Sequence, residues 1–274
     1  MTELLDGVHR IEAQVAGRPL YLFLFLGDRR LLLDAGCSTT VGDSILPYLR
    51  GLDLGVEDLD LLVITHSDLD HQGGPCALAR ESPRLLVTCG ALDRELVSDP
   101  EALVSQRYSA YLEHGIGYGE DALAWIRAMS GEAQAVDVGL AGGETIRLGP
   151  GFELRVLHVP GHSPGHLALH DERSGAVFAG DCVQGSVYLD FLAETRDYVE
   201  RLDGLACECL SLAPAGLTLR ELIERCNERL PEPWAGDAAQ ELVFSLHGHL
   251  HRFVVQGKVS VARDGDRPIF RWRG

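Results

Sequence analysis

The residues of this chain that are most suited to chemistry gather in one short stretch, residues 65–74 (THSDLDHQGG). Within six residues the stretch places His66, Asp68, Asp70 and His71. Two imidazoles and two carboxylates this close together are the nitrogen and oxygen ligands that a divalent cation takes in proteins. The stretch therefore predicts a metal site.

The residues on either side of this stretch indicate how it would be held. Residues 59–64 (LDLLVI) have the length and the β-branched content of a buried strand. The polar cluster would then follow the carboxyl end of a strand. Gly73 and Gly74 allow a tight turn after it, and Pro75 is suited to begin a helix.

The stretch resembles the HxHxDH signature of the metallo-β-lactamase-fold hydrolases, with Asp68 in place of the second histidine. In that family further ligands come from a PGH turn and from a Gly-Asp pair after a later strand. This chain has both features, as His162 in VPGHSPGH and Asp181 in VFAGDC.

The resemblance implies two neighbouring metal pockets. In the family one pocket takes both histidines of the signature and the PGH histidine. The other takes the aspartate and last histidine of the signature together with a late histidine, and the Gly-Asp carboxylate bridges the two ions. Carried over by position, the first pocket is His66, Asp68 and His162, the second is Asp70 and His71, and Asp181 lies between them.

Two departures from the family pattern bear on the metal. Gly216 stands where the late histidine is expected, and His247, His249 and His251 are the candidates to replace it. Zinc is the metal that the family implies, but a carboxylate at Asp68 hardens the first pocket and favours iron or manganese. We therefore expect one or two divalent metal ions.

Strands and helices alternate along the chain, which indicates a mixed α/β fold. Strands are expected at residues 8–15, 20–26, 31–34, 59–64, 84–88, 135–138, 144–148, 152–159, 166–170, 176–179 and 209–212. The resemblance implies a four-layer αββα metallo-β-lactamase-like sandwich over residues 1–216. Residues 217–274 form a predicted appendage of two helices and a hairpin, which resembles a winged helix.

Residues 91–131 form a helical insertion, because the gap between the HxDxDH stretch and His162 is long for the family. Two interpretations are open. The insertion is either a helical subdomain that buries its own aromatic side chains or a lid over the site, lined by tyrosines such as Tyr108, Tyr111 and Tyr118.

The predicted function is that of a metallo-hydrolase. A bound cation lowers the pKa of its water from about 15.7 to near 7, and this metal-bound hydroxide would attack a small carbonyl ester, lactone or thioester. Asp70 is expected to orient the nucleophile and relay its proton, and Tyr188 or Tyr118 is the candidate donor to the oxyanion.

Two alternatives remain open at this point. One is a non-haem iron redox protein of the same fold, because the flavodiiron branch also has an acid at the position of Asp68. The other is an inactive member that binds metal, because two expected ligands are altered.

Composition restricts the expected partners and location. The formal charge of −17 repels phosphate backbones and anionic lipid, so we expect a small-molecule substrate and neither nucleic acid nor membrane. The apolar run at residues 20–26 is too short to cross a bilayer. Seven cysteines without CxxC spacing favour a reducing cytoplasm. The appendage is expected to serve packing or homodimer formation.

Residues 161–165 (GHSPG) match the GxSxG elbow of serine hydrolases. That elbow uses the backbone N–H of the residue after the serine for its oxyanion hole. Here that residue is Pro164, which has no N–H. Ser163 is therefore predicted to be a turn residue.

Overall fold

The computed structural model describes residues 2–182, 192–231, 233–235, 239 and 242–274. The chain divides into two compact units. The first unit comprises Met1–Tyr108 and Gly119–Cys182, and the second comprises Ser109–Tyr118 and Val183–Gly274. The predicted domain boundary after residue 216 stays a prediction, because a compact unit is not thereby an independently folding domain.

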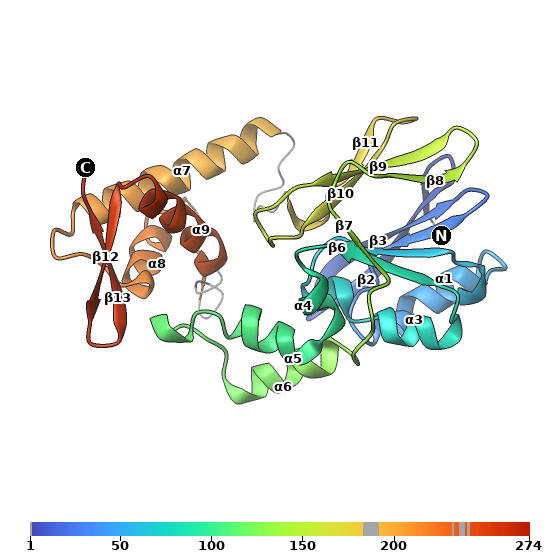
Figure 1. Ribbon diagram of the computed structural model, residues 1–274, viewed down its shortest axis with the longest axis horizontal. Helices are drawn as coiled ribbons and strands as arrows, with labels where there is room; N and C mark the ends of the chain where they lie inside the picture. Colours follow the sequence, from blue (N-terminus) through green and yellow to red (C-terminus); the bar gives the residue numbers. More distant parts are fainter. Residues whose placement is uncertain (1, 183–191, 232, 236–238, 240–241) are drawn as a thin grey trace. The chain divides into compact units, whose positions relative to one another are not determined.

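One sheet of the first unit has seven strands, which lie in the order of the sequence. The first four pair antiparallel as a meander, and the last four pair in parallel (Figure 1). The strands predicted at residues 8–15, 20–26 and 31–34 and the strand before the HxDxDH stretch are confirmed. The strands are β1 (Thr2–Leu5), β2 (Val8–Val15), β3 (Arg18–Leu26), β4 (Arg30–Leu33), β5 (Leu61–Ile64), β6 (Leu86–Gly90) and β7 (Val138–Leu140).

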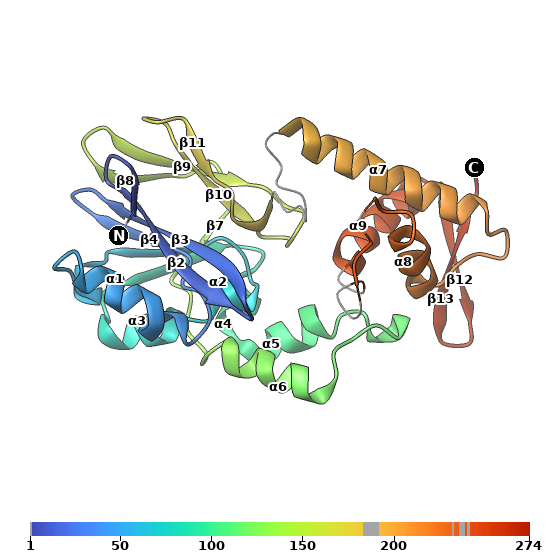
Figure 2. The ribbon, with the colours of Figure 1, turned by 180° about the vertical axis from the view of Figure 1, so that it is seen from behind.

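A second sheet of the first unit has four antiparallel strands. Helices α1 and α3 lie on the face of the seven-stranded sheet that is turned away from this second sheet (Figure 2). The second sheet contains β8 (Thr145–Gly149), β9 (Phe152–His158), β10 (Leu167–Asp171) and β11 (Ala176–Phe178). The helical segments of the unit are η1 (Val41–Ile45), α1 (Leu46–Arg50), η2 (Val56–Asp58), α2 (Leu69–Gln72), α3 (Pro75–Glu81), α4 (Arg94–Ser98), α5 (Pro100–Leu103), η3 (Val104–Tyr108), α6 (Glu120–Met129) and η5 (Gly180–Cys182).

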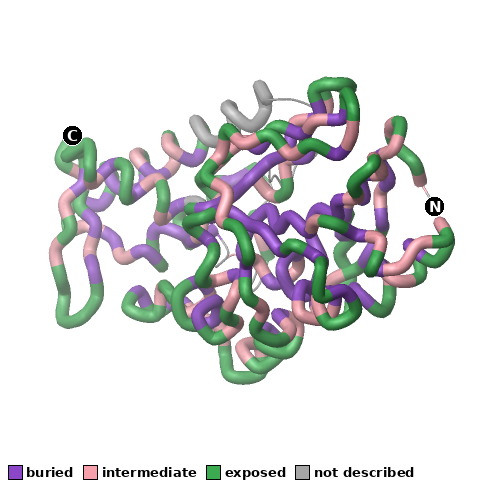
Figure 3. The backbone as a smooth tube through the Cα atoms, turned by 45° about the vertical axis from the view of Figure 1, so that its right-hand side comes forward, coloured by how far each residue is buried: buried purple, intermediate pink, exposed green. Residues whose placement is uncertain are grey.

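Strand β5 is apolar without alternation because the seven-stranded sheet is covered on both faces. Successive side chains of a strand point to opposite faces. Leu62 and Ile64 accordingly pack in the core under α1 and α3, and Val63 packs in the core between the two sheets. The buried segments in Figure 3 follow these strands, and the exposed ones follow the connecting turns. The predicted mixed α/β sandwich is confirmed.

The described residues of the second unit form three helices, a hairpin and the short η4 (Leu112–His114). Its core includes Leu210, Leu222, Leu246 and Phe270. The two helices and hairpin expected after residue 216 are present, and their likeness to a winged helix stays a prediction. The elements are α7 (Leu192–Ser211), α8 (Leu219–Asn227), α9 (Leu242–Val255), β12 (Val259–Asp264) and β13 (Arg267–Trp272).

The strand predicted at residues 209–212 is wrong, because residues up to Ser211 continue α7. Leu202, Ala206, Cys209 and Leu210 are all buried. Their spacing of three to four residues is that of one helix face. In the described part of the chain, no helix has both the length and the apolar composition needed to cross a membrane.

Candidate metal centre

The HxDxDH stretch begins where β5 ends, at the edge where the two sheets meet. The backbone N–H of Thr65 donates to Asp34 Oδ1 at 2.7 Å, and Asp34 itself follows the neighbouring parallel strand β4. The carbonyl oxygen of Thr65 accepts from the N–H of Leu167, at 2.8 Å, at the start of β10. Because of this second bond, the turn that carries His162 lies beside the stretch.

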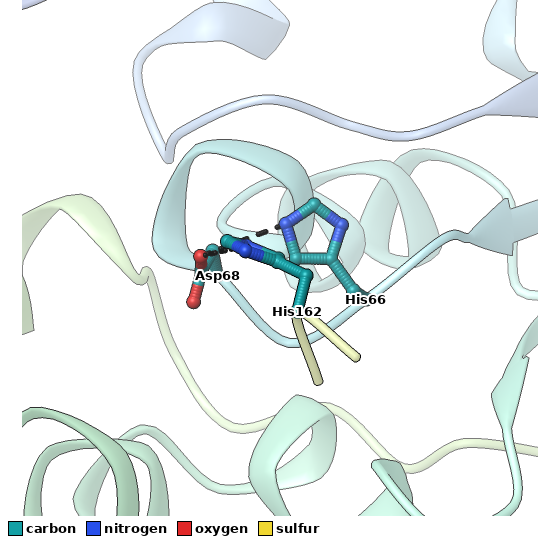
Figure 4. A group of neighbouring side chains, drawn as sticks. All are labelled: His66, Asp68 and His162. Carbon is teal, nitrogen blue, oxygen red and sulfur yellow. Dashed lines mark hydrogen bonds and ion pairs between the residues drawn. The ribbon is translucent and has the colours of Figure 1, made fainter. Parts of the chain in front are cut away.

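One group of potential ligands consists of His66, Asp68 and His162, whose ligand atoms all lie within 4.8 Å of one another. Asp68 Oδ2 is 2.7 Å from His162 Nε2 and 3.6 Å from His66 Nε2. Figure 4 shows both imidazoles turned toward the Asp68 carboxylate. We call these residues the first group.

A second group consists of His66, His71 and Asp181, again within 4.8 Å of one another. His71 Nε2 is 3.4 Å from Asp181 Oδ1, and His66 Nε2 is 3.9 Å from Asp181 Oδ2. Asp181 lies in η5, directly after Gly180, whose φ of +51° is left-handed. A Cβ at Gly180 would lie 2.9 Å from Thr65 Oγ1, so a side chain there would push Asp181 away from the group.

The two predicted catalytic residues have different outcomes. Asp70 borders the second group, since its Oδ2 is 4.0 Å from His71 Nε2, and its predicted role as a metal ligand stays a prediction. Burial raises the pKa of Asp70, and the neighbouring Asp68 carboxylate adds to this effect. Its catalytic role stays a prediction. Tyr188 lies outside the described residues.

Hydrogen bonds at the Nδ1 atoms fix how the two motif histidines face the groups. His71 Nδ1 is 2.8 Å from Asp34 Oδ2, and His66 Nδ1 is 2.9 Å from Thr65 Oγ1. The Thr65 hydroxyl in turn donates to Asp34 Oδ2 at 3.0 Å. Both Nε2 atoms are thereby turned toward the ligand groups, which is the way that metal-binding histidines are oriented in proteins.

His66 Nε2 provides the test of whether a metal fits this site. The atom is buried and has no hydrogen-bond partner among the described residues. Leaving a buried polar atom unpaired costs free energy. A cation held by His66 Nε2 and the facing carboxylates would satisfy it, so the donor set fits a divalent metal ion.

The charges in the site follow from its contacts. Burial and the neighbouring His71 lower the pKa of His66, which keeps this imidazole neutral at pH 7. Burial alone would lower the pKa of His71, but the Asp34 and Asp181 carboxylates raise it well above its ordinary value. Burial alone would raise the pKa of Asp181, yet His71 holds it well below its usual range.

The structure adds Asp34, which the sequence analysis treated only as the end of a strand. Asp34 is 3% exposed, and its carboxylate contacts both Thr65 and His71. An aspartate that interrupts the apolar run LLLDAG directly after a buried strand is the signal that could have identified it.

The structure also adds Arg107, which lies in η3 within the helical insertion. Its guanidinium binds both oxygens of Asp68, with Nε on Oδ1 and Nη2 on Oδ2 at 2.9 Å. Burial alone would raise the pKa of Asp68, but Arg107 and His162 hold it well below its usual range. No sequence motif around Arg107 identifies it as a site residue. The only signal in the sequence is the acid at Asp68, which indicates that a cationic partner lies nearby.

The helical insertion therefore reaches the site through η3. Beside Arg107, the Tyr108 hydroxyl accepts from the N–H of Leu69 at 3.3 Å, directly after Asp68. This contact joins η3 to the HxDxDH stretch, and the lid interpretation stays a prediction. Tyr111 belongs instead to the second unit, where its ring packs against Phe244 and His247.

The late histidines lie in the second unit. His249 pairs with Asp203, and the ring of His247 packs against Tyr111 and His114. Gly216 has a φ of +90° beside β13. Whether one of these histidines replaces the missing ligand stays a prediction.

Ser163 is a turn residue, as predicted. It is 2% exposed, and its hydroxyl donates to the carboxylate of Asp93. Asp93 also accepts from the N–H of Gly165 at 2.7 Å. The serine is thus committed to holding the turn that carries His162.

The chain is similar in sequence to curated hydrolases. The chain is 26% identical over 182 residues to the hydroxyacylglutathione hydrolase of Aeromonas salmonicida, which covers 65% of the chain and 55% of that protein. It is 28% identical over 208 residues to the acyl-coenzyme A thioesterase MBLAC2 of Gallus gallus, which covers 67% of the chain and 65% of that protein. The chain thus spans less than two thirds of the length of these relatives.

Solved structures with the same fold align with almost the whole chain. A metallo-beta-lactamase family protein of Thermus thermophilus covers 99% of this chain and 100% of its own, with a TM-score of 0.70 at 19% identity. A beta-lactamase domain protein of Burkholderia ambifaria covers 99% and 94%, with a TM-score of 0.72 at 15% identity. The model of the metallo-beta-lactamase superfamily matches residues 18–206. The chain therefore belongs to the metallo-beta-lactamase superfamily.

Proposed function

We propose that this chain is a metal-dependent hydrolase of a small carbonyl thioester or ester, with lactones as a further substrate class. The single observation that carries the proposal is His66 Nε2, a buried and unpaired nitrogen that lies 3.6 Å from Asp68 and 3.9 Å from Asp181. The relatives named above include a hydroxyacylglutathione hydrolase and an acyl-coenzyme A thioesterase, and both names support a thioester substrate.

The chemistry divides between the metal and the chain. A divalent cation, when bound, supplies a Lewis acid and lowers the pKa of water beside it. His66, His71 and Asp181 would hold that cation, and Asp34 orients His71 for it. Asp70, at the border of the second group, is in reach to orient the attacking water and to take its proton.

A turnover assay with metal exchange tests this proposal. The purified protein is given an acyl-coenzyme A, an S-acylglutathione and a lactone, each before and after treatment with a chelator. We expect hydrolysis of at least one substrate, its loss with chelator and its return with added zinc or manganese. Turnover that survives complete removal of metal would contradict the proposal.

Asp70→Asn gives the matched variant for the proton relay. We expect kcat to fall by about 10²–10⁴-fold, the usual contribution of general acid–base catalysis. The exposed Asp43→Asn serves as the control. An Asp70→Asn variant that holds its metal and keeps the turnover of the parent would remove Asp70 from catalysis.

The two alternatives lead to different results in the same assay. Oxygen-sensitive iron without hydrolysis would support the non-haem iron redox protein. The acid at Asp68 is the sequence feature that suggests this alternative. Bound zinc or manganese without hydrolysis of any ester, lactone or thioester would support an inactive member that binds metal.

A further inference from the structure

Arg107 lies within the first group and contacts two of its three members. Besides its bonds to both Asp68 oxygens, Nη2 is 3.3 Å from His162 Nε2, and Nη1 donates to the His162 carbonyl oxygen at 3.1 Å. The residue is 9% exposed. A cationic nitrogen therefore sits beside the same two atoms, Asp68 Oδ2 and His162 Nε2, that a metal in this pocket would bind.

The pairing of Arg107 with Asp68 gives a chemical reason for the acid at position 68. A guanidinium is always charged at physiological pH, and its planar fork matches the two oxygens of a carboxylate. An imidazole at position 68 could not accept such a bidentate bond. The acid that departs from the HxHxDH signature is thus the residue that a buried guanidinium requires.

The charge balance of the first group follows from this pair. The Asp68 anion and the Arg107 cation cancel, so this ion pair adds no net charge to the first group. A divalent ion placed there would lie next to a fixed positive charge in a buried site, where the repulsion between like charges is strong. It would also compete with Arg107 for Asp68 Oδ2, which is 2.9 Å from Nη2.

The ligand atoms of the second group also come from two imidazoles and one carboxylate. His71 and Asp181 face His66 Nε2, which has no hydrogen-bond partner in the described ranges. Two imidazoles and one carboxylate are a donor set that holds a single divalent cation in catalytic sites. His71 is fixed for that role, because its Nδ1 lies 2.8 Å from Asp34.

We propose that Arg107 takes the place of the first metal ion and that the chain holds one divalent cation, at His66, His71 and Asp181. Asp68 is then the counter-ion of Arg107 and not a metal ligand. This inference rests on the proposed function only for the presence of a metal. It specifies one metal ion per chain in place of two.

Metal stoichiometry tests the inference without any activity assay. The protein is equilibrated with zinc, dialysed against metal-free buffer and analysed for zinc per chain. We expect one equivalent for the parent and one for the control Arg127→Met, which removes an exposed arginine of the same insertion. The double variant Asp68→His with Arg107→Met replaces the ion pair with a third imidazole, and we expect it to hold two equivalents.

Two equivalents in the parent protein would overturn the inference, as would one equivalent in a folded double variant. If the double variant does not fold, Arg107→Gln replaces it. Removal of the guanidinium alone should then admit a second zinc, and a folded Arg107→Gln protein with one equivalent would contradict the inference.

The turnover assay separates this inference from the proposed function. Thioester hydrolysis by a parent protein with two zinc ions would support the proposed hydrolase function and contradict the proposal that Arg107 replaces a metal ion. One zinc ion per chain without hydrolysis of any substrate would support the proposal for Arg107 and contradict the proposed hydrolase function.

Discussion

At the scale of single residues, Asp34 connects the two motif histidines, since its carboxylate contacts both His71 Nδ1 and the Thr65 hydroxyl that reaches His66. We predict that Asp34→Asn lowers zinc affinity by about 10–100-fold, the usual cost of losing an outer hydrogen-bond partner. Asparagine tolerates the left-handed φ of +64° at this position, so the backbone is not strained.

Competition with a fluorescent zinc chelator measures this affinity. The exposed Asp43→Asn is the control for the charge change. Equal zinc affinities of Asp34→Asn and Asp43→Asn would show that Asp34 does not position the ligands.

Ser163 gives a second prediction at this scale. Because its hydroxyl donates to the buried Asp93, and because Pro164 has no N–H for an oxyanion hole, Ser163→Ala should keep hydrolytic kcat within about threefold of the parent. Steady-state kinetics on the best thioester measures this ratio. A loss of about 10³-fold or more would identify Ser163 as a nucleophile and contradict the metal-based function.

The sequence indicated which candidate ligands lie together where they are local, and their role as ligands stays a prediction. His66, Asp68 and His71 lie within six residues, and the spacing alone placed them together. The contact between Asp68 and Arg107 joins residues 39 positions apart, through an insertion whose path the sequence did not reveal. Asp70 was expected among the ligands, and the structure places it at the border of the second group.

At the scale of elements, the turn that carries His162 rests on the start of α4. The Asp93 carboxylate accepts from Ser163 and from the N–H of Gly165, and a Cβ at Gly90 would lie 1.7 Å from the Gly165 carbonyl oxygen. The close approach needs glycine at residue 90, and the carboxylate fixes the turn against it.

We predict that Asp93→Ala lowers the free energy of unfolding by roughly 3 kcal/mol, since it removes two hydrogen bonds to a buried charge and leaves the N–H of Gly165 unpaired. Denaturant unfolding measures the change. Asp121→Ala on the exposed side of α6 is the control. A variant as stable as this control would show that the carboxylate does not hold the turn.

The turn between β10 and β11 gives a prediction about pH. Asp171 is buried and accepts from Arg173 Nε at 3.1 Å and from the Ser174 hydroxyl at 2.9 Å. Burial alone would raise the pKa of Asp171, but these hydrogen bonds lower it. A lowered folded pKa contributes stability above the unfolded pKa of about 3.9, and this stability is lost as the pH falls through the folded pKa.

Asp171→Asn should therefore melt below the parent at pH 7, with a stability deficit of roughly 1–2 kcal/mol. The difference should narrow as the pH falls below about 4. Differential scanning fluorimetry from pH 7 to pH 3 measures it, with the exposed neighbour Glu172→Gln as the control. A deficit that stays constant down to pH 3 would contradict an ionised Asp171.

Elements could be predicted where burial makes the pattern simple. The apolar run before Thr65 became β5, and the runs at residues 8–15 and 20–26 became β2 and β3. The failure at residues 209–212 has a physical reason. A short apolar run at the end of an amphipathic helix looks like a strand when only four residues are read, and the helix period appears only from Leu202 onward.

At the scale of the whole molecule, the mixed α/β sandwich followed from strands that are apolar on both faces and alternate with helices. The place of residues 109–118 in the second unit could not be predicted, because Ile116 joins the core of that unit through residues far away in the sequence.

The central claim is that side chains far apart in the sequence converge on a divalent cation at the edge of the two sheets. Anomalous diffraction from zinc-loaded crystals, recorded above and below the zinc absorption edge, tests this most directly. We predict a zinc peak about 2.0–2.2 Å from His66 Nε2, His71 Nε2 and a carboxylate oxygen of Asp181. Zinc found only elsewhere, for example at His249 and Asp203, with none at these three residues, would contradict it.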